Sequence, residues 1–492
     1  MKNNRVIVLL RSLSRREFNK FLLFVSSPFF NQSPKLIKLI DYLATLYPDF
    51  PPSLTKKEIL FKHLYGEAVT YEDQKIHDHL SQLLRLFESF VCQMKFREDR
   101  TGADLYLLEG LKQRRLDKQF HRAYRRVEER LEKVANKNAA YFLDHFKLQE
   151  IHAEFHDSRQ IRGKHHTFSQ ILTSLKSYYL NSSLQYACEI LNRRNIAKLD
   201  IEFNKQLIEE IRAQLEGEDN PYMEMPIISI YYKILLNLLE PEKIIHYEDL
   251  KNLLATYGAS FSKSEANVMY AYAQNYCVWQ VNNGNTRFRG ELFELYKDLL
   301  KAELLSTDSG DFPHEHYKNI TTLGLMLKEY DWVFDFLEQY KHKLGQGVRE
   351  NAHSYNLATY YYATKQHPKA MRLLQQVEFT DVYYNVSARA TLLKIFFETG
   401  DYDSIKYVSQ AFQAYLKRNK ALSNLHYNRH SNFIQMIRKL ARLQGKRRHM
   451  EHEDFQVELR KIGVELDKLK ECSFRSWIKT RIKEMETEKS LV

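Results

Sequence analysis

Three histidines and one glutamate come nearest to a metal-binding or catalytic motif in this chain. His145, His152 and His156 are seven and four residues apart, which places them on one face of a helix, and Glu154 lies inside the second pair. Histidine and carboxylate side chains bind zinc, so this face has the chemistry of a metal site. The metalloprotease pattern, however, requires Glu directly after the first His, and Ala153 stands there. We therefore predict neither a metal nor a cofactor.

Other residue patterns of catalysis are missing as well. The sequence has no glycine-rich phosphate loop, no G-x-S-x-G elbow and no cysteine paired by sequence context with a base. The four cysteines, at positions 92, 188, 277 and 472, show no C-x-x-C spacing, which argues against a zinc knuckle and a disulfide framework and favours a reducing compartment. Charged residues interrupt every apolar stretch before it reaches the length of a membrane span. We predict a protein that is not an enzyme, is cytoplasmic and does not associate with membranes.

Composition indicates a helical fold. The 492 residues include 15 Gly and 10 Pro, well below the usual levels of about 7% and 5%, and this excludes an all-β fold because hairpins and barrels need many such turn residues. Several polar residues are also placed to start helices. Three precede Glu at the capping-box spacing and two precede Pro: Ser14 with Glu17, Thr55 with Glu58, Ser262 with Glu265, Ser33 before Pro34, and Asn220 before Pro221.

Breaks between the helical stretches divide the chain. The clearest break runs from Thr307 to Pro313 and includes Asp308 and Ser309 between two strongly helical stretches. We predict four regions: an N-terminal helical region over 1–98, degenerate helix pairs over 99–310, repeats over 311–416, and basic C-terminal helices over 417–492.

A sequence echo about 35 residues apart is the strongest signal for the fold. Residues of the segment 356–374 recur in register in 391–409: Asn356-Leu357-Ala358, Tyr361, Ala370 and Leu374 correspond to Thr391-Leu392-Leu393, Phe396, Ile405 and Ser409. Gly400-Asp401-Tyr402 mark the turn inside the second copy. A two-helix unit of this length cannot bury its apolar face alone and must stack on its neighbours, so the echo predicts a solenoid.

At residues 317–412, about a fifth of the chain, the sequence resembles the tetratricopeptide repeat (TPR) family. The middle repeat supplies every signature position, with Leu357, Ala358, Tyr361, Ala370, Leu374 and Val377. The third repeat has Leu393 and Ile405 where the family prefers small residues, and the first has Gly324 where an aromatic residue belongs. The resemblance implies an all-α, right-handed α-solenoid of stacked helix pairs, with a less regular N-terminal helical region and a C-terminal capping helix. The upstream pairs, 222–239 with 247–257 and 266–281 with 288–305, have suitable lengths but no signature.

The same resemblance implies a groove lined by the first helix of each repeat, where the family binds peptides. Carried over residue by residue, the groove positions are Lys318, Asn319, Thr322, Tyr355, Asn356, Thr359, Tyr362, Ser387, Lys394 and Phe397. An asparagine amide can hold an extended peptide backbone at both its donor and its acceptor. Ser387 and Thr391 stand where some family members carry the basic residues of a carboxylate clamp, so we expect no clamp. Whether the groove binds a peptide or packs the chain's own tail is left open.

Positive charge is concentrated after the repeats. Between residues 417 and 450 there are ten Lys and Arg residues and no Asp or Glu, in a chain of net charge +12, and His426, His430 and His449 add charge below neutral pH. A polyanion patch is predicted at Arg438, Lys439, Arg442, Lys446, Arg447 and Arg448. A solvated helix face, or a surface for an acidic partner, explains the same pattern.

The N-terminal region supports a separate hypothesis. A short helix from Leu54, a turn near Gly66 and a longer helix from Asp73 to Phe90 resemble the helical part of winged helix-turn-helix domains. That resemblance implies DNA contacts by the longer helix, through Gln74, Lys75, His77, Asp78, Ser81, Gln82 and Arg85. No alternating strand pair for a wing follows, and Asp73 and Asp78 oppose DNA binding.

Near the C-terminus an apolar seam repeats at spacings of four and three residues. It consists of Phe455, Leu459, Ile462, Leu466 and Leu469. A helix that covers the last repeat is the expected role, and dimerisation is the alternative. For the whole chain we predict a scaffold or adaptor that binds another protein or peptide through the TPR-like groove. The alternative is a nucleic-acid-associated regulator that uses the N-terminal helices or the segment 417–450, and the partner and the oligomeric state are left open.

Overall fold

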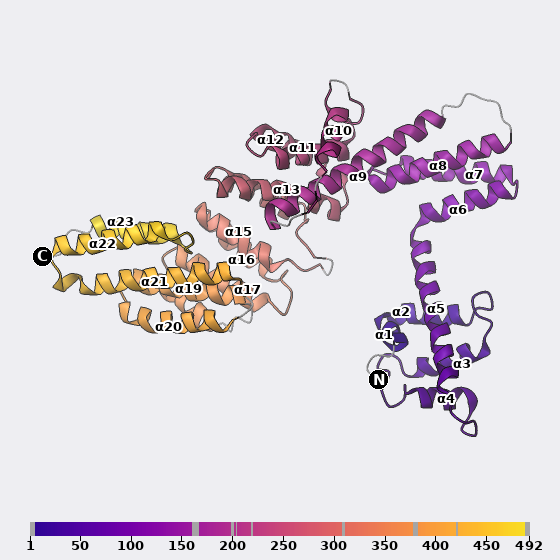
Figure 1. Ribbon diagram of the computed structural model, residues 1–492, viewed down its shortest axis with the longest axis horizontal. Coiled ribbons are helices and arrows are strands. Elements are labelled where there is room, and N and C mark those ends of the chain that lie inside the picture. The colour runs from indigo at the N-terminus through magenta and orange to yellow at the C-terminus, as the bar shows by residue number, and fades with distance from the viewer. Residues whose placement is uncertain are drawn as a thin grey trace. The chain divides into compact units, whose positions relative to one another are not determined.

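The computed structural model describes residues 5–159, 167–197, 201–202, 204–217, 220–307, 310–376, 382–419 and 422–487 (Figure 1). Within these ranges the regular elements are all helices, and the one extended contact is an isolated bridge between Phe312 and Leu344. The predicted all-α class is therefore confirmed. Among the described residues no helix combines the length and apolar composition needed to cross a bilayer. Val377, Asp308, Ser309 and Lys420, which the sequence analysis uses, lie outside the described residues.

The chain divides into two compact units, residues 1–186 with 205–228, and residues 187–204 with 229–492. The predicted division into four regions stays a prediction. The helices of the first unit are α1 (Arg5–Ser12), α2 (Arg15–Val25), α3 (Pro34–Thr45), α4 (Lys57–Tyr65), α5 (Asp73–Glu98), α6 (Arg100–Gln113), α7 (Asp117–Glu132), α8 (Ala139–Ser158), most of α9 (Thr167–Ala197), and α10 (Lys205–Leu215).

Two hydrophobic clusters organise the first unit. The larger one joins α1 to α5, and α5 crosses it with a helical series of buried residues: Ile76, Leu80, Leu83, Phe87 and Phe90. The smaller one joins α6, α7 and α8. No strand for a wing follows α5 in the described residues, where α6 begins at Arg100.

The helix starts follow their sequence signals only in part. The predicted capping boxes at Ser14 with Glu17 and at Ser262 with Glu265 are both formed. Ser33 occupies the N-cap position of α3 and Pro34 is the first helical residue, as predicted, but the Ser33 side chain makes no capping hydrogen bond. The start predicted at Thr55 is wrong, because α4 begins at Lys57 and the Thr55 hydroxyl donates to the Pro51 carbonyl oxygen at 3.1 Å.

The start predicted at Asn220 is also wrong. The next helix begins at Pro226, and the Asn220 side chain instead bridges the preceding turn: its Nδ2 donates to the Gln214 carbonyl oxygen at 2.6 Å, and its Oδ1 accepts from the Tyr222 N–H at 3.0 Å. Both errors have the same cause, because a polar residue that favours a cap can satisfy a turn equally well.

The second unit contains the C-terminal end of α9 and a series of further helices: α11 (Pro226–Leu239), α12 (Ile244–Tyr257), the short η1 (Gly258–Ser260), α13 (Lys263–Asn282), α14 (Phe288–Lys301), α15 (His314–Met326), α16 (Tyr330–Lys341), α17 (Arg349–Ala363), α18 (His367–Gln376), α19 (Val382–Glu398), α20 (Tyr402–Arg418), α21 (Asn424–Lys446), the short η2 (Arg447–His449), α22 (His452–Lys468) and α23 (Arg475–Thr487). From α15 onward, alternate helices contact each other, α15 with α17, α17 with α19, and α19 with α21. The second helix of each pair also contacts the first helix of the next, as α16 does with α17 and α18 with α19.

Small residues allow the paired helices to approach closely. Ala358 of α17 and Ala370 of α18 are both fully buried, and the two helices contact each other. Close packing explains why position 324 is a glycine, where the repeat pattern has an aromatic residue. A Cβ atom at Gly324 would lie 2.5 Å from Cγ2 of Val333 in α16 and 3.1 Å from the ring of Phe293 in α14. An aromatic side chain therefore cannot occupy this position, where α15 packs against both neighbours.

The C-terminal helices share one hydrophobic cluster with α19 and α20. Phe455, Leu459, Ile462 and Leu466 of α22 are buried in it, and Leu469 packs against it. The predicted apolar seam is thus covered within the chain and is not an exposed surface for dimerisation.

We predict that Gly324→Ala lowers the free energy of unfolding by about 1–3 kcal/mol, since overpacking costs more than the gain in helix propensity returns. Gly463→Ala is the matched control, because Gly463 is also helical and its Cβ would meet nothing within 4 Å. The control should gain about 0.5–1 kcal/mol. Urea unfolding followed by tryptophan fluorescence measures both changes, and equal effects at the two glycines would contradict the close approach of α15 and α16.

Candidate functional site

The predicted groove residues lie on the first helices of three successive pairs. Lys318, Asn319 and Thr322 belong to α15, residues 355–362 to α17, and Ser387, Lys394 and Phe397 to α19. Because α15 contacts α17 and α17 contacts α19, the structure brings these positions onto neighbouring helices. These residues differ in solvent exposure, and the exposure determines which side chains a bound peptide could contact.

Several of the predicted groove residues are enclosed. Asn356 is 1% exposed, and its Nδ2 donates to the Ala352 carbonyl oxygen of its own helix at 2.8 Å. The Thr359 hydroxyl donates to the Tyr355 carbonyl oxygen at 2.9 Å. Tyr355 is buried, and its ring lies 5.6 Å from Nζ of Lys318. Asn356 therefore does not offer its amide to a peptide, whereas Asn319 and Thr322 remain accessible.

Lys394 lies in an internal cage. Its Nζ is 4.6 Å from the ring centre of Tyr362 and 4.5 Å from that of Phe474, and it has no ion pair among the described residues. The side chain is buried, and burial lowers its pKa to about 8 in spite of the nearby carboxylate of Glu398. Because Phe474 just precedes α23, the C-terminal segment supplies one wall of this cage.

Glu398 anchors the same C-terminal segment. Its Oε1 accepts from the Tyr362 hydroxyl at 2.7 Å and from Nε1 of Trp477 at 2.8 Å, and its Oε2 lies 3.2 Å from Nζ of Lys365. Burial raises the pKa of Glu398, but the hydrogen bonds from Trp477, Tyr362 and Lys365 outweigh this effect, and the pKa lies below its ordinary value. At Tyr362 and Lys394 the predicted groove therefore packs the chain's own C-terminal segment, one of the two alternatives that the sequence left open.

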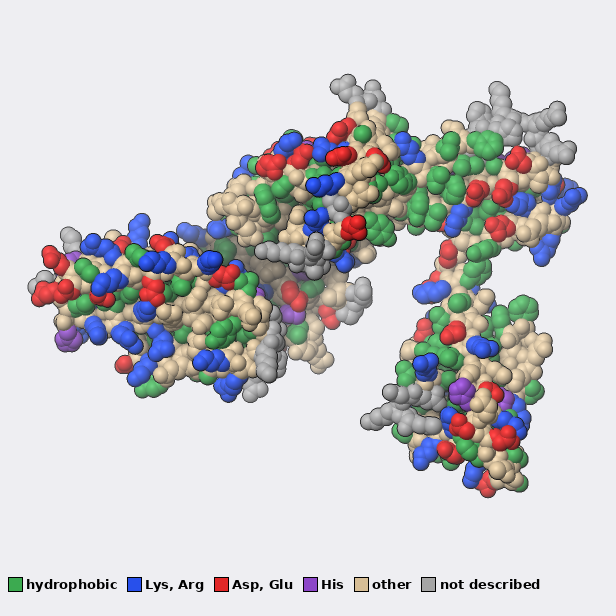
Figure 2. Space-filling view, viewed as in Figure 1, with side chains coloured by type: hydrophobic (Ala, Val, Ile, Leu, Met, Phe, Trp, Pro, Cys, Tyr) green, Lys and Arg blue, Asp and Glu red, His purple; other side chains and the backbone are tan. Residues whose placement is uncertain are grey.

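The predicted polyanion patch is only partly exposed. Lys439 forms an ion pair with Glu465 of α22, and the Arg447 guanidinium lies 4.1 Å from the ring centre of Phe455. Arg438 is half-buried, whereas Arg442, Lys446 and Arg448 are exposed. Figure 2 shows Lys and Arg side chains over much of the visible face of the C-terminal helices. Burial, together with nearby cationic groups, lowers the pKa of His430 to about 4, so the charge that the sequence predicts for it below neutral pH is expected only in strongly acidic solution.

The histidines of α8 do not converge on a metal position. Nδ1 of His145 lies 2.8 Å from the Ser174 hydroxyl of α9, while Nε2 of His152 and Nε2 of His156 lie 3.0 Å apart and share a hydrogen bond. Burial and the neighbouring His156 and His121 lower the pKa of His152 to about 4. In the part of the chain that the structure describes, no group of three or more His, Cys, Asp or Glu side chains is arranged to hold a metal ion.

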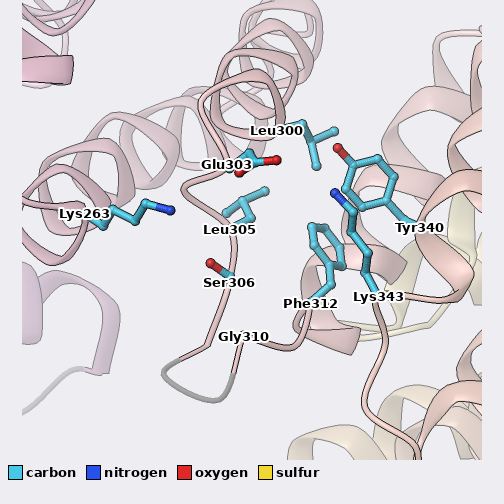
Figure 3. A pocket seen from close by; sticks show the side chains of 9 residues that line it. All are labelled: Lys263, Leu300, Glu303, Leu305, Ser306, Gly310, Phe312, Tyr340 and Lys343. Carbon is cyan, nitrogen blue, oxygen red and sulfur yellow. The ribbon is translucent and has the colours of Figure 1, made fainter.

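A hollow of about 270 Å³ lies between the end of α14 and the end of α16 (Figure 3). Lys263 and Lys343 face it together with the carboxylate of Glu303, which offsets their charge. Nζ of Lys343 also lies 4.7 Å from the ring centre of Tyr340. This hollow therefore offers no concentrated site for an anion.

A pocket at helices α9, α11, α12 and α13 has a more specific lining. Four asparagines border it, with aromatic and aliphatic side chains between them: Asn192, Asn195, Asn237 and Asn275, with Tyr272, Tyr276, Trp279, Ile234, Leu238, Pro241 and Leu250. We refer to these residues as the asparagine pocket. Its volume is about 90 Å³, below the about 300–1,000 Å³ typical of small-molecule sites. It therefore suits a peptide unit with a small side chain better than a cofactor.

Asn237 is the least expected member of the asparagine pocket. It is 5% exposed, yet neither its Nδ2 nor its Oδ1 has a hydrogen-bond partner among the described residues. Leaving such a buried amide unsatisfied costs about 1–3 kcal/mol. Opposite it, Nδ2 of Asn275 donates to Oδ1 of Asn192 at 3.3 Å, which joins α13 to α9.

Hydrogen bonds from α13 fix the walls of the asparagine pocket. The Tyr276 hydroxyl and Nε2 of Gln280 both donate to the Pro241 carbonyl oxygen at 3.0 Å. The Tyr272 hydroxyl donates to the Glu189 carboxylate at 3.3 Å, and the Tyr276 ring stacks on that of Tyr247 at 5.0 Å. The pocket is thus formed before any ligand arrives, which reduces the entropy that binding must overcome.

The chemistry of this lining suits recognition of an uncharged group. Among the described residues that line the asparagine pocket there is no carboxylate, histidine, lysine or cysteine side chain that could act as an acid, base or nucleophile. An amide side chain presents one acceptor and two donor hydrogens, which match the N–H and C=O groups of a peptide backbone. Sequence reasoning considered only Asn319 and Asn356, because the helix pairs that carry Asn237 and Asn275 have no repeat signature. The sequence did contain one signal for this pocket, because the first helix of each of these pairs carries an asparagine.

The buried lysine generates a prediction about pH. The unfolded chain keeps the Lys394 proton up to its ordinary pKa of 10.5, whereas the folded chain releases it near pH 8. The free energy of unfolding of the wild type should therefore rise with pH between these values, by up to about 3 kcal/mol. Lys394→Met removes this contribution, so its stability relative to the wild type should be highest below pH 8 and decline towards pH 10.5.

Urea unfolding of both proteins across this pH range measures the difference. Lys461→Met, at an exposed lysine of α22, is the control and should show no such trend. A stability difference for Lys394→Met that does not vary with pH would mean that Lys394 is solvated rather than caged.

Comparisons with known proteins do not indicate a function for this chain. No family model, no curated protein and no solved structure matches this sequence. The resemblance of residues 317–412 to the TPR family therefore stays a prediction from the sequence, and the structure adds that successive helices there contact one another.

Proposed function

We propose that this chain is a noncatalytic adaptor, formed by a right-handed solenoid of TPR-like helix pairs, that holds an extended segment of a partner protein. The contacts from α15 to α21 support this arrangement, since each pair covers the apolar face of the next. The small residues Ala358 and Ala370 at the pair interface support it as well. The free thiols of Cys188 and Cys277 in the core agree with a cytoplasmic location.

The observation that carries the proposal is the unsatisfied amide of Asn237 in a preformed pocket. A backbone N–H and C=O of the partner would pair with this amide, while Asn192, Asn195 and Asn275 would hold neighbouring peptide units. Trp279, 39% exposed, provides an apolar surface beside them. Because these contacts are made to the peptide backbone of the partner, peptides with different side chains would be able to bind.

Asn237→Leu tests the role of this amide. Leucine has nearly the same shape and needs no hydrogen bond, so the free energy of unfolding should rise by about 1 kcal/mol while affinity for an extended peptide falls at least about tenfold. Linear 12-residue peptides selected from a display library against the full chain serve as probes, with affinities measured by fluorescence anisotropy. N-methylation of one backbone amide in a selected peptide should also abolish binding.

Asn181→Leu is the matched control, because Asn181 of α9 is likewise buried with an unsatisfied amide but does not line the asparagine pocket. It should gain stability without a change in affinity. Selected peptides that bind the Asn237→Leu variant as tightly as the wild type would refute the proposed function, as would a library that yields no binding peptide.

The exposed cations Arg442, Lys446 and Arg448 favour the alternative, a nucleic-acid-associated regulator. Since Lys439 and Arg447 are engaged within the chain, we expect only nonspecific binding of labelled DNA or RNA, with a Kd of about 10⁻⁴–10⁻⁶ M at physiological salt. Reversing the three exposed cations to Glu should weaken this binding and flatten its salt dependence. Tight, sequence-dependent binding that survives the reversal would point to the helices α4 and α5 and would replace the adaptor proposal.

A further inference from the structure

An apolar groove crosses the surface of the first unit between α2 and α5. Its volume is about 340 Å³, and it is lined by Lys20, Leu23, Phe24, Ser27, Phe30, Phe90, Gln93, Met94 and Arg97. We refer to it as the α2–α5 groove. Phe24 and Phe90 form its floor and belong to the hydrophobic cluster of α1 to α5, so the groove is anchored on a packed core.

The walls of the α2–α5 groove expose large apolar side chains. Leu23 is 74% exposed, and the adjoining Phe29 is 87% exposed. The ring of Phe30 stacks on Phe24 at 4.1 Å and contacts Phe29 edge-on at 4.9 Å, which holds this wall in place. Isolated exposed apolar residues are common on protein surfaces, but a contiguous apolar hollow with aromatic walls marks an interaction site.

Charge at the α2–α5 groove has one sign. Lys20 on α2 and Arg97 on α5 both line it, the lining contains no carboxylate, and neither cation forms an ion pair among the described residues. The nearest acid on α2, Glu17, is committed to the capping box with Ser14. A ligand with acidic residues beside its apolar anchors therefore complements this groove.

The lining also determines the backbone conformation of the ligand. Among the described lining residues, Ser27 and Gln93 are the only uncharged polar side chains, so an extended peptide would bury backbone N–H and C=O groups without partners. A helix satisfies these groups internally and presents apolar side chains at positions i, i+3, i+4 and i+7. The asparagine pocket has the opposite chemistry, because its amides can pair with an extended backbone.

We propose that the α2–α5 groove binds an acidic amphipathic helix of a partner protein. Two or three apolar side chains of that helix insert between Leu23, Phe30 and Met94, and carboxylates on its flanks pair with Lys20 and Arg97. This inference is independent of the proposed function, since it concerns another unit of the chain and another class of ligand.

A phage-displayed library of helical 18-residue peptides, selected against the full chain, tests the proposal. The apolar positions i, i+3, i+4 and i+7 vary among Leu, Phe, Met and Ala, and the flanking positions vary among Glu, Lys and Ser. Enriched peptides should combine large apolar anchors with a net negative charge. In anisotropy titrations with one enriched peptide, Leu23→Glu should lower affinity at least about tenfold, and the double variant Lys20→Glu with Arg97→Glu about threefold to tenfold.

Leu172→Glu is the matched control, because Leu172 of α9 is 66% exposed and does not line the groove. It should leave the affinity unchanged. The proposal is wrong if no peptide is enriched, if lysine-rich peptides are enriched equally, or if the two leucine variants behave alike. Cosedimentation with phosphatidylserine vesicles that Leu23→Glu abolishes would assign the groove to a lipid surface instead. Self-association abolished by the same substitution would assign it to a second copy of the chain.

Discussion

The close approach of paired helices is the constraint on which the second unit depends. Gly324 lies where α14 and α16 pack against α15, so a larger side chain there would force the helices apart, and Ala358 of α17 is fully buried. Successive helices contact one another from α15 to α21, and in the proposed solenoid this stacking would bury the apolar face of each pair. The helix contacts continue through α19, which carries Lys394, to α21.

The buried polar side chains of the second unit differ in how far their hydrogen-bonding groups are satisfied. Asn356 and Asn237 are both almost fully buried, but Nδ2 of Asn356 donates to its own helix, whereas neither end of the Asn237 amide has a partner among the described residues. Lys394 is buried beside Glu398 and two aromatic rings, and its lowered pKa reflects the cost of that burial. Glu398 accepts hydrogen bonds from Tyr362 of α17 and from Trp477 of α23. These bonds join the C-terminal helix α23 to α17 and α19.

The two proposed binding sites complement each other in chemistry. The asparagine pocket offers amide donors and acceptors in a narrow space and suits an extended backbone. The α2–α5 groove offers aromatic and aliphatic walls with two cations and suits a helix with acidic flanks. A chain with both sites can engage two different segments, on one partner or on two, although neither proposal depends on the other.

The sequence by itself determined the helical class, two capping boxes, the turn at Gly400 and the apolar seam of α22. Each of these depends on residues within a few positions of one another, where periodicity and capping chemistry are decisive. It did not determine which apolar or polar face each helix leaves uncovered. Only the tertiary structure placed Phe474 and Trp477 on the predicted groove, enclosed Asn356, and joined Glu189 to Tyr272 and Asn192 to Asn275 beside the asparagine pocket. The physical reason is that a helix sequence specifies which of its sides is apolar, whereas the neighbour that covers that side is selected by contacts between segments far apart in the chain.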